Sequence, residues 1–357
     1  GSEAQALNTT AIAIGSSANA KDAGNIAIGS GSKAENSAAT ATGDSAQALG
    51  WKSSAFGTGA KALGHGSVAI GLNAEAGNQS NKDTGAAWAI AIGGKALNTN
   101  TIAIGNGANA SNGGAVAIGP NTNASGGSSL AMGQSACATN TNSLALGSNA
   151  KAQGIGTVAL GVGAVTSTDT GAMALGGNAS GIYSVAVVSG SQTKGGYAIA
   201  MGLNAVSEDS GIAQGLNAKA ANNAISLGRD SKALAQNGVA LGGSAVATNR
   251  DDVALGSGSV TGARNALTSI QIGGVEVGNN GKSSGSAVLA VGNSNSARQV
   301  QYVSAGAISA DSTDAINGSQ LYKVIGVLDS TASTATTAKT TADNAKTAAD
   351  TAQATAT

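Results

Sequence analysis

A short apolar motif that ends in glycine recurs along the first 260 residues of the chain. It reads apolar residue, alanine, apolar residue and glycine, as in Ile12–Gly15 and Ile26–Gly29. The motifs follow one another about every fourteen residues over most of this region. A fixed period this short is typical of a solenoid, in which each repeat forms one coil and packs only against its neighbours. We therefore predict an all-β solenoid over residues 1–260.

Each coil is predicted to contain two short strands joined by turns. Side chains alternate between the two faces of a strand, so Ile12 and Ile14 share one face and Ala13 lies on the other. We expect the two isoleucines to point into the coil and Ala13 to point out. In the second strand, Ala18 and Ala20 are expected to face inward, with a polar residue between them facing solvent. The glycine that ends each motif lets the backbone turn.

The alanine of the motif forms a column that is expected to face away from the core of its own coil. A strand that faces water is expected to alternate apolar and polar residues, but this column is neither polar nor bulky. Small side chains would let a second copy of the same surface approach closely. The sequence therefore predicts a self-association surface that contains Ala13, Ala27, Ala69, Ala103, Ala117, Ala131, Ala145 and Ala159. The alternative is that alanine is merely tolerated at this position.

The longest interruption of the period predicts a protruding loop. Gly71 and Gly93 are 22 residues apart, so residues 73–88 contain most of an insertion. Insertions in solenoids form loops, and loops often carry binding residues. An exposed aromatic side chain can anchor a partner, so the candidate ligand-binding residues here are Trp51, Lys82, Asp83 and Trp88. The alternative for each tryptophan is that it covers an adjacent apolar edge.

The pattern changes after residue 260. Residues 261–297 contain two partial copies of the motif, at Ile270–Gly273 and Leu289–Gly292. We expect this segment to form irregular β-strands in a transition that follows the repeats. Apolar residues then recur at spacings of three and four, which predicts a parallel α-helical coiled coil over residues 323–357. Its interface positions are Leu321, Val324, Leu328, Thr331, Ala335, Ala338, Ala342, Ala345, Ala349 and Ala352. A disordered linker of threonine and alanine is the alternative for this tail.

Composition agrees with a narrow solenoid. Aromatic residues make up 2% of the 357 residues and charged residues 10%, with 55 glycines and one proline. A globular core uses large side chains, which are scarce here. The formal net charge is zero, from 18 basic and 18 acidic residues, so we expect no nucleic-acid partner. The longest apolar runs are too short for a transmembrane helix.

Candidate catalytic and metal-binding residues are nearly absent from the sequence. His65 is the single histidine, so it can form neither a histidine-rich zinc site nor part of a recognisable catalytic triad. We expect it to be a solvated turn residue. Cys137 is the single cysteine, which excludes an internal disulfide, and we expect an incidental exposed thiol. The sequence predicts no enzyme activity, no cofactor and no bound metal.

Two segments near the end of the chain carry motifs of a known family. Residues 298–306 read RQVQYVSAG and residues 311–322 read DSTDAINGSQLY. Following the repeats in this order, they make the chain resemble a trimeric autotransporter adhesin of Gram-negative bacteria. The repeats resemble its Yersinia-adhesin-type head, residues 298–322 its neck, and the heptads the start of its stalk. The matching neck residues are Arg298, Gln299, Asp311, Asp314, Ala315, Asn317 and Gln320.

The resemblance implies features that spacing alone does not give. It implies a left-handed parallel β-roll of fourteen-residue coils and a homotrimer in which three rolls pack about a threefold axis. The chains are expected to cross in the neck, where the wide head meets the narrow stalk. The family is exposed on the bacterial cell surface at the outer membrane. We expect its membrane anchor to lie outside this chain, because Gly1-Ser2 is typical of a cloning remnant.

The function implied by the resemblance is cell adhesion. Three identical faces would bind an extracellular matrix protein, a host cell or an abiotic surface multivalently, with a role in virulence. The alternative is a passive structural spacer that extends another binding domain from the cell surface. Binding of the isolated chain to any matrix protein or surface would distinguish the two.

Overall fold

The computed structural model describes residues 1–78, 88–263, 270–272, 275–277, 287–309 and 311–356. It divides into two compact units, Gly1–Ala297 and Arg298–Thr357. Each unit is described by itself. The first contains the repeats and the second a single long helix. Lys82, Asp83 and most of the loop predicted over residues 73–88 lie outside the described residues.

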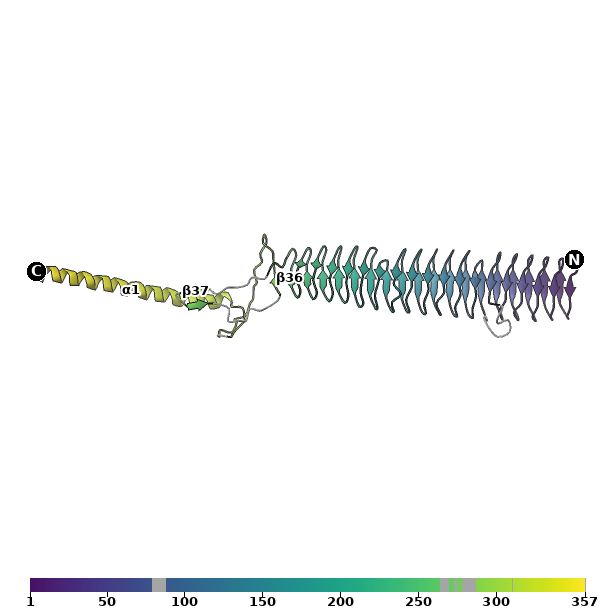
Figure 1. The fold of residues 1–357 in the computed structure, drawn as a ribbon, viewed down its shortest axis with the longest axis horizontal. Helices are drawn as coiled ribbons and strands as arrows, with labels where there is room; N and C mark the ends of the chain where they lie inside the picture. The colour runs from purple at the N-terminus through teal and green to yellow at the C-terminus, as the bar shows by residue number, and fades with distance from the viewer. Residues whose placement is uncertain (79–87, 264–269, 273–274, 278–286, 310, 357) are drawn as a thin grey trace. The chain divides into compact units, whose positions relative to one another are not determined.

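The first unit is the predicted parallel β-solenoid, with two strands in each coil (Figure 1). One strand of each coil is two residues long and pairs in parallel with its equivalents in the neighbouring coils, which makes an 18-stranded sheet. The strands of this sheet are β1 (Gln5–Ala6), β3 (Asn19–Ala20), β5 (Lys33–Ala34), β7 (Gln47–Ala48), β9 (Lys61–Ala62), β11 (Glu75–Ala76), β13 (Lys95–Ala96), β15 (Asn109–Ala110), β17 (Asn123–Ala124), β19 (Cys137–Ala138), β21 (Lys151–Ala152), β23 (Val165–Thr166), β25 (Asn178–Ala179), β27 (Gln192–Thr193), β29 (Val206–Ser207), β31 (Lys219–Ala220), β33 (Lys232–Ala233) and β35 (Val246–Ala247).

The other strand of each coil is three residues long and carries the apolar motif. Its register places each motif alanine beside that of the next coil, as Ala103 lies beside Ala117. The strands of this second sheet are β2 (Ile12–Ile14), β4 (Ile26–Ile28), β6 (Thr40–Thr42), β8 (Ser54–Phe56), β10 (Val68–Ile70), β12 (Ile90–Ile92), β14 (Ile102–Ile104), β16 (Val116–Ile118), β18 (Leu130–Met132), β20 (Leu144–Leu146), β22 (Val158–Leu160), β24 (Met173–Leu175), β26 (Val185–Val187), β28 (Ile199–Met201), β30 (Ile212–Gln214), β32 (Ile225–Leu227), β34 (Val239–Leu241) and β36 (Val253–Leu255).

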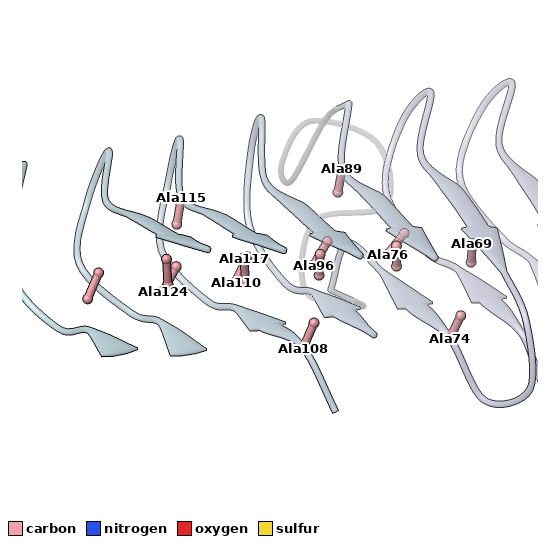
Figure 2. Close-up of a cluster of buried hydrophobic side chains, with 14 of the residues drawn as sticks. Ala69, Ala74, Ala76, Ala89, Ala96, Ala108, Ala110, Ala115, Ala117 and Ala124 are labelled. Carbon is pink, nitrogen blue, oxygen red and sulfur yellow. The ribbon is translucent and has the colours of Figure 1, made fainter. Parts of the chain in front are cut away.

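The core of the solenoid is made almost entirely of alanine methyl groups. In one coil, Ala34 from β5 and Ala41 from β6 are both fully buried, together with Ser32 and Ala39. Figure 2 shows this interior, with alanines of both sheets such as Ala69 and Ala76 among its labelled residues. A fourteen-residue coil encloses little space, so its buried positions hold mostly methyl groups and other small side chains, and Leu63, Asn25 and Asp252 are among the few larger ones.

The prediction for the three-residue strands was therefore wrong in its choice of face. We expected Ile12 and Ile14 to point inward, but they are 45% and 56% exposed. The motif alanines point inward instead, because the narrow coil has no space for an isoleucine. Ala13, in an outermost coil, is partly buried, and the other alanines predicted to face a partner have no exposed surface: Ala27, Ala69, Ala103, Ala117, Ala131, Ala145 and Ala159. They form the core and cannot form an interface between chains.

The two-residue strands have the predicted orientation. Ala18 and Ala20 are fully buried, and Asn19 between them is partly exposed. Buried hydroxyl groups next to the strands also find partners. Ser53 donates to the carbonyl oxygen of Gly50 at 2.7 Å, and Thr101 donates to that of Asn98 at 2.6 Å. The polar atoms of these inward side chains are thus satisfied within the turn, as buried groups require.

The glycine that ends each motif lies where successive coils approach most closely. Gly29 has φ +130°, and a Cβ atom there would lie 2.3 Å from the carbonyl oxygen of Gly43 in the next coil. Neither the backbone conformation nor the available space accepts a side chain. The recurrence of glycine in the sequence therefore follows from the stacking of the coils.

The last coil of the solenoid pairs with one further strand from later in the chain. β39 (Leu289–Ala290) pairs in parallel with β36, and β37 (Ile270–Ile272) pairs with β38 (Val275–Val277) in an antiparallel hairpin. Both partial copies of the motif after residue 260 thus contain strands. The carboxylate of Asp252 accepts a hydrogen bond from the backbone N–H of Val288 at 2.9 Å, beside the start of β39.

The second unit contains one helix, α1 (Gly318–Ala356), which confirms a helix rather than a disordered tail. The side chain of Asn317 accepts a hydrogen bond from the backbone N–H of Gln320, as an N-cap residue does. Eight threonines of α1 donate to the carbonyl oxygen four residues before them, for example Thr331 to Val327. No helix in the described part of the chain combines the length and apolar character that a membrane span requires.

Candidate functional site

The outer surface of the three-residue strands is mostly apolar, with polar side chains at Thr40, Thr42, Ser54 and Gln214. We call the first and third residues of these strands the apolar face. In-register pairing stacks them into ladders, such as Ile92, Ile104, Ile118 and Met132. Between about a third and a half of the side-chain surface is exposed at Ile12, Ile14, Ile28, Phe56, Ile70, Ile90, Ile92, Met132, Leu160, Met173, Met201 and Leu255. Contiguous exposed apolar surface of this extent marks an interaction site.

The outer surface of the two-residue strands is mostly polar. We call the first residues of these strands the polar face. Lys33, Lys61 and Lys95 are exposed there, and Asn109 donates to Asn123 at 3.2 Å in a side-chain ladder that continues toward Cys137. Cys137 is partly exposed. The column of lysine and amide side chains that the sequence assigned to solvent is therefore confirmed.

Three rings from successive coils meet at one turn. The ring centroids of Trp51 and His65 lie 4.7 Å apart, and those of His65 and Trp88 lie 5.3 Å apart. The Lys52 ammonium group lies 4.0 Å from the centre of a Trp51 ring, in cation–π contact. Trp51 is 41% exposed and Trp88 60% exposed, so the cluster lies at the surface. It brings together two of the four residues predicted to bind a ligand.

His65 differs from its prediction as a solvated turn residue. Its ring lies between the two tryptophans, and its Nε2 atom is buried without a hydrogen-bond partner in the described part of the chain. The sequence contained a signal for the first contact, since Trp51 and His65 are fourteen residues apart and thus occupy the same position in adjacent coils. The insertion before Trp88 hid the second contact.

A second aromatic pair occupies the equivalent turn further along the solenoid. The rings of Tyr183 and Tyr197 lie 6.0 Å apart, and both side chains are more than half exposed. Like Trp88, both tyrosines have positive φ angles. The sequence analysis did not identify them as site residues.

The neck residues form a hydrogen-bond network around the start of α1. The Gln320 side chain accepts from the backbone N–H of Gly306 at 3.1 Å and donates to its carbonyl oxygen at 2.7 Å. Asn317 donates to the carbonyl oxygen of Val303 at 3.0 Å, and Asp314 accepts from the backbone N–H of Ala307 at 3.0 Å. The other residues assigned to the neck are exposed in this chain: Arg298, Gln299, Asp311 and Ala315.

The large heptad residues at the start of α1 lie on the surface of the single chain. Leu321, Val324 and Leu328 are 49%, 51% and 61% exposed. Their spacing of three and four residues places them along one side of the helix. An apolar stripe of this kind is stabilised when it packs against another helix.

Asp252 is the one described side chain whose pKa is clearly shifted. Burial raises the pKa of this carboxyl, but hydrogen bonds from Thr261, Val288 and Asn249 outweigh that effect and hold the pKa below its usual value. The residue closes the last coil and has no catalytic arrangement around it. Among the described residues, no group of three histidine, cysteine, aspartate or glutamate side chains is placed to hold a metal ion.

Comparison with known proteins identifies the repeats. The model of the YadA head domain repeat matches residues 48–74, 96–122, 124–150, 152–179, 221–245 and 233–259. No curated protein matches the chain. Among solved structures, the C-terminal YadA-like domain of a Burkholderia pseudomallei protein is 42% identical over 30% of this chain and 51% of that chain, with a TM-score of 0.28. The collagen-binding domain of the Yersinia adhesin YadA is 25% identical over 64% of this chain and 84% of that domain, with a TM-score of 0.24.

The chain spans about half of the Burkholderia domain. The repeat matches fall on coils between β7 and β36, and within this range the longest stretches without a match are residues 75–95 and 180–220. The family consists of adhesin domains rather than enzymes. The matched segments of the solenoid are therefore similar to YadA head repeats.

Proposed function

We propose that this chain is the adhesive head, neck and first stalk segment of a bacterial surface adhesin that acts as a parallel homotrimer. The observation that carries the proposal is the apolar face, which runs from β2 to β36 with polar side chains only in β6, β8 and β30. No element among the described residues covers it. A second sheet of the same solenoid carries the polar face, so the two kinds of surface are separated. The apolar face would pack against two other copies, and the polar face would meet ligands.

The energetics of burial favour this arrangement. Burying a half-exposed isoleucine, leucine or methionine side chain contributes about 1 kcal/mol. Twelve large apolar side chains of the apolar face are at least a third exposed in each chain, so their summed contribution offsets the entropy lost on association. In-register stacking makes the face straight and regular, which suits contact with an identical copy.

The helix would continue the same assembly. Leu321, Val324 and Leu328 would form the first layers of a three-stranded coiled coil, and the alanines that follow would bring the helices close together. Alanine buries little apolar surface, so the coiled coil would depend on the head for much of its stability.

Adhesion follows from multivalency. Three identical polar faces on one particle raise the apparent affinity for a repetitive ligand well above that of a single face. Such a particle would be exposed at the outer membrane on the bacterial surface. Its targets would be extracellular matrix, host cells or abiotic surfaces, and the exposed Trp51 and Trp88 are candidate contact residues together with Lys82 and Asp83.

A binding panel tests the adhesive role. The purified chain would be applied to immobilised collagen, because the similar Yersinia domain is a collagen-binding domain, and to other matrix proteins, cells and glass. We expect saturable binding to at least one surface, weakened by a Trp51→Ala and Trp88→Ala double variant. A trimer that binds nothing on the panel would contradict adhesion and support the spacer alternative.

A further inference from the structure

Two consecutive coils near the end of the solenoid have a shortened turn. Gly202, Gly215 and Gly228 are thirteen residues apart instead of fourteen. The missing residue lies in the turns between the two sheets. Four residues separate β29 from β30 and β31 from β32, where five separate β3 from β4. Because two successive coils each lack one turn residue, the surface of the solenoid changes at this place.

A hollow of about 300 Å³ lies at these two shortened turns. Its floor is formed by the methyl groups of Ala220, Ala221 and Ala233. Ala220 and Ala233 are 3% and 1% exposed, whereas equivalent alanines of regular coils are fully buried, so the hollow reaches the edge of the core. The volume is at the lower end of the range for small-ligand pockets and suits a single ring-sized group.

The wall of the hollow combines a free cation with apolar surface. Lys219 lies beside Lys232 in register on the adjacent strand, at a strand spacing of about 4.8 Å. Their other in-register neighbours are Val206 and Val246, and the described part of the chain gives neither lysine an ionic partner. Two like charges side by side destabilise a sheet unless an anion compensates them.

The rest of the rim supplies polar and apolar contacts. Lys194 and Glu208 form an ion pair at 3.1 Å and remain about half exposed. Leu234 also lines the hollow and is 50% exposed, and Val206 is partly buried beside Lys219 on the adjacent strand. A ligand there would meet hydrogen-bonding groups on one side and aliphatic carbon on the other.

We propose that this hollow binds a sugar residue that carries a carboxylate or sulfate group. Lys219 would receive the anionic group, and Lys232 on the adjacent strand would add positive charge beside it. The Lys194–Glu208 pair would bind hydroxyl groups, and Leu234 and Val206 would contact the C–H face of the ring. A sugar suits the site better than an acidic peptide does. The backbone of β29, β31 and β33 is already paired on both sides, so it offers a peptide no strand edge.

The inference rests on the adhesive role proposed above, since it names a class of ligand for the same polar face. Its test is a calorimetric titration of the complete chain with 3′-sialyllactose, with a heparin-derived disaccharide and with neutral lactose. We expect binding of at least one anionic sugar, weakened by added salt, and no binding of lactose. The two anionic probes distinguish a sialylated glycan from a sulfated glycosaminoglycan as the source.

Three variants make the test specific. Lys219→Gln is expected to weaken the anionic sugar at least about tenfold. Ala221→Leu fills the hollow with a side chain that the same position carries in the next coil, at Leu234, and is expected to abolish binding. Lys33→Gln is the matched control on the same column in a regular coil, and it is expected to bind as the wild type does.

Different results would contradict the sugar site and the adhesive role. The sugar site is overturned if neither anionic sugar binds, if an acidic peptide binds equally well, or if Lys219→Gln and Ala221→Leu bind as tightly as the wild type. The adhesive role is judged separately by the binding panel. Variants that no longer bind the sugar but still bind matrix proteins would support the sugar site. Binding to matrix would then involve another part of the surface.

Discussion

At the scale of single residues, the fold depends on the size of alanine. Every motif alanine from Ala27 onward lies in a core with no exposed surface, beside equally small side chains from the other sheet. Protein interiors are closely packed, so an added methylene group displaces its neighbours. In most folds alanine is a neutral choice, whereas here it is the residue that permits the coil to close.

Replacement of a core alanine tests this account. Ala117→Leu should destabilise the chain by about 1–3 kcal/mol, because the coil cannot widen at one position without losing in-register pairing to both neighbours. Lys151→Leu on the polar face is the control and should change stability by less than about 0.5 kcal/mol. Urea unfolding followed by circular dichroism measures both. Equal stability of Ala117→Leu and the wild type would show that the core is not filled.

Asp252 gives the solenoid a defined response to acid. Its folded-state pKa lies below the ordinary value of 3.8, so the carboxylate stabilises the last coil above that pH. The stabilisation is lost as the pH falls through the lowered pKa. Asp252→Asn should therefore cost about 1–3 kcal/mol at neutral pH and little in strong acid. Thermal unfolding from about pH 2 to pH 7 should give curves that converge at low pH, and parallel curves would contradict this role.

At the scale of the element, the turns differ from coil to coil more than the strands do. The indole of Trp88 lies on Gly66, and the ring of Tyr183 lies on Gly171 in the same way. In each case the glycine leaves space for the ring of the next coil. The strands repeat, but the turns place the tryptophans and tyrosines of the solenoid in two surface clusters.

A matched pair of glycine substitutions tests the turn geometry. Gly66 and Gly31 have φ angles of +62° and +63°, so alanine at either should cost about 1 kcal/mol in backbone strain. A Cβ atom at Gly66 would lie 2.9 Å from the Trp88 indole, whereas one at Gly31 would lie 3.6 Å from the nearest side chain. Gly66→Ala should shift tryptophan fluorescence to longer wavelength and Gly31→Ala should not. Identical emission spectra would place the indole elsewhere.

The strands and their period could be predicted from the sequence, but the inward face of one strand could not. Alternation shows that Ile14 and Ala13 lie on opposite faces and does not say which is inside, since both residues are apolar. The width of the coil decides this, and it depends on how both sheets close around the core. In the two-residue strands the polar residue, such as Asn19, fixed the choice correctly.

The candidate site was predictable to a smaller extent. Trp51 and Trp88 were identified as exposed candidates, but their contact through His65 crosses an insertion that shifts the register. The hollow at Ala221 has a sequence signal in the thirteen-residue spacing of Gly202, Gly215 and Gly228. Its meaning became clear only when the structure placed Lys219 and Leu234 around it.

At the scale of the whole molecule, the exposed apolar surface is the feature that indicates association with a partner. The single chain exposes the apolar face on the first unit and the stripe from Leu321 to Leu328 on the second. Each surface is regular along its own element. Both would be buried together if three chains associate in parallel, which is why we assign them to one assembly.

Charge placed on the apolar face should weaken that assembly. The double variant Ile70→Lys and Ile92→Lys would bring lysines of neighbouring chains together in an apolar interface, where unpaired charge is strongly unfavourable. We expect a lower solution mass or a melting temperature lowered by several degrees, with the solenoid still β-rich by circular dichroism. Asn123→Lys on the polar face is the control and should leave mass and melting unchanged. Unaltered assembly of the double variant would place the interface elsewhere.

The mass of the wild-type chain in solution tests the central claim most directly. Sedimentation equilibrium over a range of concentrations gives this mass independently of shape. We predict three times the 33.5 kDa of one chain, stable on dilution into the micromolar range. A mass of 33.5 kDa at all concentrations would contradict the account, because the apolar face and the heptad stripe would then remain exposed to water.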